Sequence, residues 1–236
     1  MNDKLMFCSN SADAKIGRGK GETVINPKDY TELGLIKDWR KALSNFYIAP
    51  FRLDDNEWNS VEHFFHAVKF RNNKIASKNY EFYKTFTVNG EKPWSKNAKF
   101  AKQAGKAGRI SIRNDKKYVY DGIIDGDKIP QNVQMRQDFY TSKVDSRVQK
   151  IAFLAKFTQH DDLKRLLLST GDAELWHCTE NRGKDNPTDE GNPEVKKGII
   201  LEELMIVRDC IRKFDQKCNL AEASQFSSEF ITNILE

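Results

Sequence analysis

The chain has 236 residues, of which 39% are hydrophobic and 31% charged, a composition that suits a folded domain with a buried core and excludes a disordered protein. No apolar run approaches the roughly 18 to 20 residues of a membrane-spanning helix, and the N-terminus has no apolar run of signal-peptide length. We therefore expect a soluble protein of the cytoplasm or nucleus without a membrane partner. The four cysteines include no C-x-x-C pair, which predicts free thiols rather than a disulfide framework or a zinc site.

The charge balance is mildly basic. A net charge of +5 and a pI near 8.9 are compatible with an anionic ligand. Much of the excess lies in residues 96–113, which contain basic side chains and no acidic one. This stretch is typical of a solvated helix face followed by a loop, and a surface that faces phosphates is the alternative.

The N-terminal region begins with a short predicted strand, LMFC at residues 5–8, followed by a glycine-rich loop at residues 16–22. Such a loop can bring backbone N–H groups close to an anion, although the same glycines suit an ordinary flexible connection. Next, Asn26 and Pro27 predict the N-cap and first position of a short helix that runs toward Leu33.

The middle of the chain begins with a predicted β-hairpin. Residues 46–53 and 57–58 are typical of extended pieces around the turn-like residues 54–56. Asn59 or Ser60 then caps a helix that runs through Phe70. Further helices are predicted at about 76–86, 95–106, 135–158, 161–169 and 198–214 from their apolar spacing. The polar residues 180–197 predict a loop.

The helix of residues 60–70 carries side chains that can do chemistry. Glu62, His66 and Lys69 lie along one edge of its apolar stripe, which consists of Val61, Phe64, Phe65 and Val68. Glu62 and Lys69 point in nearly the same direction about 10 Å apart, so a ligand atom can be held between them. Partial burial would raise the carboxyl pKa and lower the amine pKa, as a general acid and a nucleophilic lysine require. Spacing alone favours a simpler interpretation, a border of ordinary charged side chains.

Two other features of the sequence are less specific. His63 and His66 lack the H-E-x-x-H pattern and have no evident third ligand, so neither a metal nor another cofactor is expected. Gly171 is predicted to end the helix of residues 161–169, and Asp172 opens an extended segment. The Asp172 carboxylate is equally compatible with satisfying turn amides and with a role in chemistry.

Several blocks occur in one order along the chain. Residues 43–51 read L-S-N-F-x-x-x-P-F and residues 60–70 read S-V-E-H-aromatic-aromatic-x-A-x-K-F. Residues 155–159 read A-K-F-x-Q, and residues 167–175 read L-L-x-T-G-D-A-x-L. These four blocks resemble the NADAR, or YbiA-like, family. Residues 9–13 and 17–21 resemble the opening of a longer subgroup, and the resemblance covers about residues 7 to 213.

The resemblance implies a mainly α fold, a single YbiA-like helical domain with a few short β-strands over residues 1–214, and a helical tail at residues 215–236. It also implies cleavage of N-glycosidic bonds of ribosyl substrates. By matched position, Glu62 is the acid/base, Lys69 is the nucleophile that forms a Schiff base with the opened ribose C1, and Asp172 orients the sugar or assists proton transfer. The implied substrate-binding residues are Arg18, Gly19 and Lys20 at phosphates, Asn45 and Phe46 at ribose or base, and His63, His66, Thr170 and Gly171.

The substrate is the most open part of this interpretation, because residues 73–132 depart most from short members of the family. The leading hypothesis is a hydrolase that removes ADP-ribose from guanine in DNA or RNA, favoured by the basic middle stretch and the longer N-terminus. One alternative is an N-glycosidase of phosphoribosylamine intermediates of riboflavin biosynthesis. Another is a module that binds ADP-ribose or NAD without cleaving it, which would not need both Glu62 and Lys69. The sequence does not predict an oligomeric state.

Overall fold

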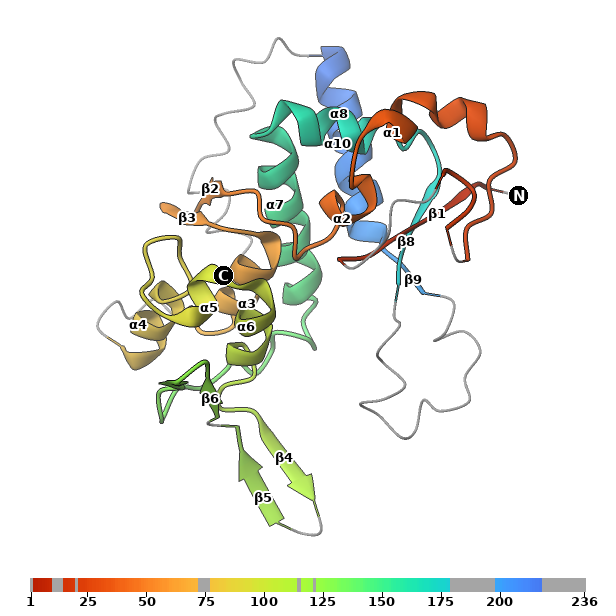
Figure 1. Ribbon diagram of the computed structural model, residues 1–236. Helices are drawn as coiled ribbons and strands as arrows, with labels where there is room; N and C mark the ends of the chain where they lie inside the picture. Colours follow the sequence, from red (N-terminus) through yellow and green to blue (C-terminus); the bar gives the residue numbers. More distant parts are fainter. Residues whose placement is uncertain are drawn as a thin grey trace. The chain divides into compact units, whose positions relative to one another are not determined.

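The fold is mainly helical (Figure 1). A computed structural model describes residues 2–9, 15–19, 21–71, 77–113, 116–120, 122–178 and 198–217. Helices make up most of the described secondary structure and the strands are few and short, which confirms the predicted fold class of helices with a few short strands. Within the described ranges, no helix combines the length and the apolar character that crossing a membrane requires.

The described residues form two compact units. Unit 1 combines residues up to Tyr47 with residues from Phe157 onward, and unit 2 runs from Ile48 to Lys156. Helix α7 (Val144–Thr158) ends just past this boundary. The proposed division at residue 214 stays a prediction, and helix α10 (Glu202–Lys217) continues beyond it.

Unit 1 is built on a three-stranded sheet in the order β1-β8-β9. Strand β1 (Lys4–Phe7) pairs in parallel with β8 (Glu174–His177), which pairs antiparallel with β9 (Ile199–Ile200). The strands predicted at residues 5–8 and after Asp172 are therefore confirmed. The other helices of unit 1 are η1 (Pro27–Tyr30), α1 (Thr31–Leu35), α2 (Trp39–Ala42) and α8 (Asp161–Leu168).

The predicted start of the first helix in unit 1 is also confirmed. Asn26 has an extended backbone, and its side chain accepts a hydrogen bond from the Lys28 amide, with Pro27 at the first helical position. Proline suits this position because its fixed φ is helical and its missing N–H has no partner there.

Unit 2 begins with the predicted hairpin. Strand β2 (Phe51–Leu53) pairs antiparallel with β3 (Asn56–Trp58). Helix α3 (Val61–Val68) follows β3 directly. The remaining elements of unit 2, apart from α7, are α4 (Lys78–Lys84), α5 (Pro93–Lys96), α6 (Ala98–Ala104), the paired strands β4 (Ile110–Arg113) and β5 (Lys116–Val119), and the paired strands β6 (Ile123–Ile124) and β7 (Asp127–Lys128).

A core of buried aromatic side chains packs against helix α3. Trp58 and Phe64 are fully buried and meet edge to face with ring centroids 5.1 Å apart, and Phe70 meets Phe82 in the same way at 4.8 Å. Aromatic pairs of this geometry add to the stabilisation that burial itself provides. The helix that carries the candidate residues is therefore held on a rigid base.

Several of the predicted helices have different bounds. The helix expected at 198–214 begins only at Glu202, because Ile199 and Ile200 form strand β9. The helix expected at 135–158 begins only at Val144, because Lys143 has φ 56° and this left-handed conformation cannot continue a right-handed helix. The helix expected at 95–106 is two helices, α5 and α6. The break lies at Asn97, which is extended and whose side chain caps α6 by accepting from the Lys99 amide at 2.9 Å.

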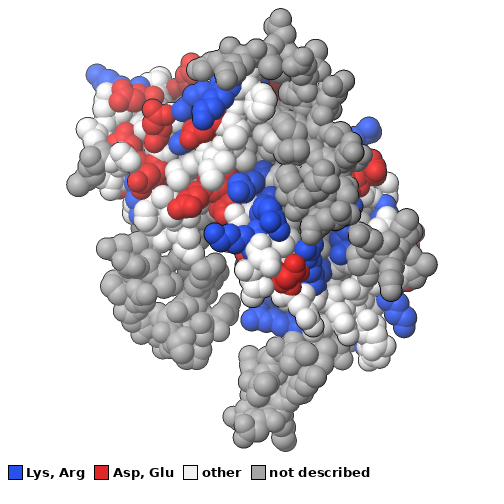
Figure 2. All heavy atoms as spheres, turned by 180° about the vertical axis from the view of Figure 1, so that it is seen from behind, with Lys and Arg blue, Asp and Glu red and all other residues white. Residues whose placement is uncertain are grey.

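The basic stretch at residues 96–113 was expected to be a helix face and a loop, and it also contains strand β4. Pairing with β5 was not predicted, because each of the two strands has only four residues and gives a weak alternation pattern. Figure 2 shows both basic and acidic side chains on the described surface of one face. The described surface in that view is therefore not uniformly basic.

Candidate active site

Helix α3 starts where the sequence predicts, but its first turn uses Ser60 in a different way. Ser60 has an extended backbone and makes no side-chain cap to a helix amide. Its hydroxyl instead pairs with Nδ1 of His63 at 2.7 Å. Both residues are fully buried, so this pair fixes the His63 ring beside the start of the helix.

The apolar stripe of α3 is only partly as predicted. Val61, Phe64 and Val68 are buried in the core of unit 2, whereas Phe65 is half-buried. The edge residues, by contrast, are more buried than a border of surface charges would be: Glu62 is 5% exposed, His66 7% and Lys69 3%. Charged side chains are almost never this buried unless they are paired, so the simpler interpretation of an ordinary charged edge is wrong.

Glu62, His66 and Lys69 form one hydrogen-bonded row along α3. Nε2 of His66 lies 2.9 Å from Oε1 of Glu62, and Nζ of Lys69 lies 3.0 Å from Nδ1 of His66. The spacings i,i+4 and i,i+3 place these three side chains on one side of the helix. The imidazole therefore occupies the gap between Glu62 and Lys69 that the sequence analysis assigned to a ligand atom.

Aromatic rings surround the amine of Lys69. Its Nζ lies 5.1 Å from the ring centroid of Phe65, 5.5 Å from that of Phe139 and 5.3 Å from that of Tyr140. The backbone oxygen of Lys69 also accepts from the Arg136 amide at 2.8 Å, which ties the segment carrying the two later rings to the end of α3. Phe139 and Tyr140 were not predicted as site residues, because nothing in the local sequence indicates that this segment returns to α3.

The surroundings lower the pKa of the Lys69 amine to about 8. Burial is the main cause, the positive charges of Arg109 and Lys102 act in the same direction, and Glu62 and Asp145 oppose it. This confirms the direction expected for a nucleophilic lysine. Arg109 and Lys102 themselves are exposed and were singled out only as part of the basic stretch.

The pKa of Glu62 does not move in the predicted direction. Burial by itself would raise it, but the hydrogen bond from His66 and the positive charges around the carboxyl outweigh burial and lower it. For the His66 imidazole, burial lowers the pKa despite the opposing effect of Glu62. At neutral pH the row therefore consists of a carboxylate, a neutral imidazole and a mostly protonated amine.

His63 contributes a second buried imidazole. Burial lowers the pKa of His63 to about 4, and among the described residues its Nε2 has no hydrogen-bond partner. No cluster of three or more metal-ligating side chains occurs in the ranges that the structure describes.

The glycine-rich loop of unit 1 binds the carboxylate of a residue of the same chain, Glu22. The amides of Gly17 and Gly19 donate to Oε2 of Glu22 at 3.0 and 2.9 Å, and the Met6 amide donates to Oε1. The guanidinium of Arg40 completes the site through both carboxylate oxygens, with both side chains buried. In this structure Glu22 accepts the Gly19 amide, and a contact between Gly19 and a substrate stays a prediction.

The side chains predicted around this loop have separate outcomes. Arg18 is exposed, and its contact with a phosphate stays a prediction. Lys20 lies outside the described residues. Asn45 and Phe46 are both half-buried in unit 1, and their contacts with ribose or base also stay predictions.

The second polar cluster of unit 1 is organised by two arginines of α10. Thr170 is buried and accepts from Nη1 of Arg208 at 3.1 Å. The Gly171 carbonyl and the Asp172 carboxylate each accept from Arg212 at 2.8 Å. Asp172 is thus paired with an arginine rather than with turn amides, and its side chain is 92% exposed. Neither arginine was predicted from the sequence, since helix α10 lies far along the chain.

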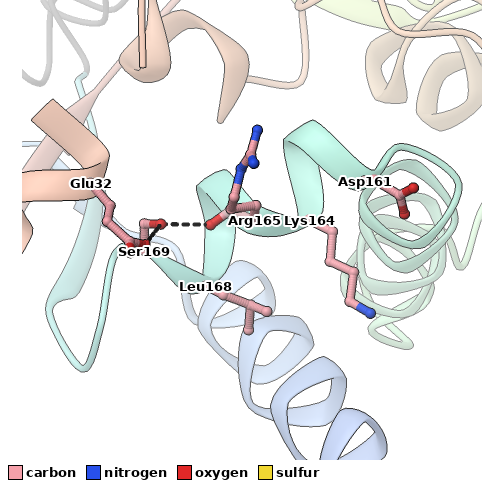
Figure 3. Close-up of a pocket in the computed structure, with 6 residues that line it drawn as sticks. All are labelled: Glu32, Asp161, Lys164, Arg165, Leu168 and Ser169. Atoms are coloured by element: carbon pink, nitrogen blue, oxygen red, sulfur yellow. Dashed lines mark hydrogen bonds between the residues drawn. The ribbon is translucent and has the colours of Figure 1, made fainter. Parts of the chain in front are cut away.

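Two surface pockets lie away from the predicted residues. One in unit 1, with a volume of about 370 Å³, lies between α1 and α8 and is lined by Glu32, Asp161, Lys164, Arg165, Leu168 and Ser169 (Figure 3). Ser169 donates to the Arg165 carbonyl there. Another in unit 2, of about 620 Å³, is lined by Lys78, Glu81, Phe82, Thr85, residues 128–130, Gln131 and Asn132. The charged lining residues of both pockets are exposed or half-buried, whereas those of the row on α3 are buried, so the row remains the candidate site.

Comparison with known families gives the decisive match. The NADAR domain family matches residues 36–185, which is more than half of the chain. The chain belongs to the NADAR family. The matched range contains all of α3 and residues 170–172, and it begins after the glycine-rich loop. The catalytic residues assigned by resemblance therefore lie inside the NADAR domain, and the predicted phosphate contacts at Arg18, Gly19 and Lys20 lie before it.

Individual relatives of this NADAR chain are more distant. It is 27% identical over 161 residues to N-glycosidase YbiA of Shigella flexneri serotype 5b (strain 8401) and, to the same degree, to N-glycosidase YbiA of Shigella flexneri. Each alignment covers 68% of this chain and 77% of the relative. A solved NMR structure of the E. coli protein YbiA is 22% identical, covers 78% of this chain and 84% of its own, and aligns with a TM-score of 0.48.

Proposed function

We propose that this chain is an N-glycosidase that hydrolyses a ribosyl–base N-glycosidic bond, with Lys69 as nucleophile and Glu62 as acid/base. The observation that carries the proposal is the buried row in which His66 joins these two residues at 2.9 and 3.0 Å. A lysine whose amine has a pKa of about 8 has a useful neutral fraction near neutral pH. The N-glycosidase names of the Shigella relatives support the same class of reaction.

The chemistry balances with water as the only co-substrate. The sugar ring opens as the base nitrogen forms a double bond to C1 and the ring oxygen takes a proton. The Lys69 amine adds to C1, a proton passes from its nitrogen to the base nitrogen, and the base leaves, so C1 is held as a Schiff base. Water then adds to C1 and releases the sugar aldehyde and the free amine. Glu62 is proposed to carry the proton between the two nitrogens, a role that suits its carboxylate resting form.

ADP-ribose on a guanine base is the proposed substrate. The exposed side chains of Arg109 and Lys102 are close enough to Lys69 to lower its pKa, so they are placed to attract phosphates attached to the sugar. A diphosphate and a nucleic-acid strand use such cations more fully than a single phosphate does. Asp172 is proposed to orient the sugar, as its matched position implies.

The test compares three substrates with one protein. ADP-ribosylated guanine DNA, its RNA counterpart and a phosphoribosylamine riboflavin-pathway intermediate are incubated separately with the full chain, and the released sugar phosphate is measured. A parallel reaction is trapped with borohydride and the protein is weighed. We expect release of ADP-ribose and a sugar adduct with the first two substrates, and loss of both in Lys69→Ala.

The matched control is Lys99→Ala, which removes an exposed lysine of α6 and should keep both signals. Turnover of only the phosphoribosylamine would replace the proposed substrate with the riboflavin-pathway alternative. Tight binding of ADP-ribose without product or adduct would instead indicate a binding module and overturn the enzymatic proposal.

A further inference from the structure

His66 offers a different hydrogen-bonding edge to each of its neighbours in the row. Its Nε2 faces the Glu62 carboxylate, which only accepts hydrogen bonds, so Nε2 must carry a proton. Its Nδ1 faces the amine of Lys69. If Lys69 is an ammonium, Nδ1 must be the acceptor, and the imidazole is neutral.

The same contacts also fit a second arrangement of the protons. One proton can move from Nζ of Lys69 to Nδ1 of His66 along the existing 3.0 Å hydrogen bond. The imidazole becomes an imidazolium, which donates from Nε2 to Glu62 and from Nδ1 to the amine until the amine lone pair turns toward the substrate. The total charge of the three groups is unchanged, and every hydrogen bond of the row is kept.

We infer that His66 is a positioning residue that takes the proton of Lys69 and so releases the neutral amine for attack, while Glu62 holds the imidazolium. This role rests on the proposed function, since it concerns the Lys69 nucleophile. It differs from the contact with substrate that resemblance assigned to His66, because the row occupies both ring nitrogens with protein groups.

The charged groups around the row bear on this transfer. Moving the positive charge from Lys69 to His66 brings it closer to Glu62 and away from Arg109, both of which favour the transfer. Lys102 acts on both groups, and Asp145 favours the charge on Lys69. The rings around Lys69 also favour the ammonium, so the neutral imidazole is the resting form.

The imidazole is held in place by the end of α6. Gly105 lies so close to it that a Cβ added there would be 2.1 Å from Nδ1 and 2.5 Å from Cγ of His66. The ring is also 7% exposed and meets the Phe65 ring edge-on at 5.4 Å. A fixed ring keeps the proton donor and acceptor aligned, which proton transfer requires.

The test uses His66→Gln, in which the amide can still donate to Glu62 and accept from Lys69 but cannot take a proton. The rate of adduct formation on Lys69 is measured against pH by cyanoborohydride trapping in single-turnover reactions. In the wild-type protein, the rate should level off below the pKa of Lys69, because the transferred form has a population independent of pH. In His66→Gln, it should fall about tenfold per pH unit, since only solvent can then deprotonate the amine.

The two profiles should meet above the pKa of Lys69 and diverge increasingly as the pH falls below it. His160→Gln, a histidine at the N-cap position of α8 in unit 1, is the matched control and should keep the wild-type shape. Parallel profiles in wild type and His66→Gln would overturn the role of His66 alone. Absence of an adduct in the wild-type protein would overturn the nucleophile, and this role with it.

A measurement on the wild-type protein decides the question if His66→Gln does not fold. Nitrogen NMR of the imidazole should show a neutral ring with its proton on Nε2 at neutral pH. A ring protonated on Nδ1 alone cannot accept from Lys69, and its observation would overturn the inference.

Discussion

Gly105 and His66 are in such close contact that position 105 accommodates no side chain without moving the imidazole. We expect Gly105→Ala to displace the ring, to lower the rate of adduct formation on Lys69 and to destabilise unit 2 by about 1–3 kcal/mol, as overpacking does. Gly122→Ala is the control, since its Cβ would make only ordinary contact with Tyr120 at 3.6 Å. Denaturant unfolding and trapping measure the two effects, and an unchanged rate in Gly105→Ala would show that the ring tolerates the shift.

Phe65 is expected to set the pKa of Lys69 by excluding water. Its ring lies 5.1 Å from the amine, and burial is the main reason that the pKa is about 8. Phe65→Ala should let water reach the amine and raise the pKa toward the ordinary lysine value, because hydration favours the charged form. The pKa is measured by NMR after ¹³C-methylation of lysines, with Phe86→Leu, in the aromatic core below α3, as a control. If the pKa of Lys69 stays near 8 in Phe65→Ala, the neighbouring charges and not the Phe65 ring would be what lowers it.

His63 should make stability depend on acid. Burial lowers its pKa from 6.5 to about 4 in the folded chain, so between these values the unfolded state binds more protons than the folded state. The free energy of unfolding that His63 contributes is therefore fully present above pH 6.5. It is lost as the pH falls toward 4, by up to about 1.4 kcal/mol per pH unit. Denaturant unfolding across this range should give a smaller slope for His63→Gln than for the wild-type chain. His160→Gln should keep the wild-type slope, and an equal slope in both variants would contradict the assignment.

Glu22 is expected to be structural rather than part of an anion site. It neutralises Arg40 and accepts the amides of the glycine-rich loop in a buried position. Glu22→Gln leaves the guanidinium without its counter-charge and should destabilise unit 1 by about 3–5 kcal/mol. The double variant Glu22→Gln with Arg40→Met should recover part of this loss, because no uncompensated charge stays buried. If Glu22→Gln is as stable as the wild-type chain, the glycine-rich loop would again be a candidate ligand site.

Local sequence was enough to predict the helices with clear caps and periodicity, the hairpin before α3 and the placement of Glu62, His66 and Lys69 along one edge of a helix. These features follow from local steric preferences and from the 100° rotation per residue, which need no knowledge of the rest of the fold. The order of the family motifs also pointed to the NADAR family, which the family match over residues 36–185 shows.

How these three side chains work together depends on the packing of distant segments around them. Their burial, the lowered pKa of Glu62 and the aromatic surroundings of Lys69 depend on segments far along the chain, such as Gly105 and Phe139. A helical projection gives the direction of a side chain but not what fills the space beside it. It therefore left a gap between Glu62 and Lys69, and packing filled that gap with the His66 imidazole.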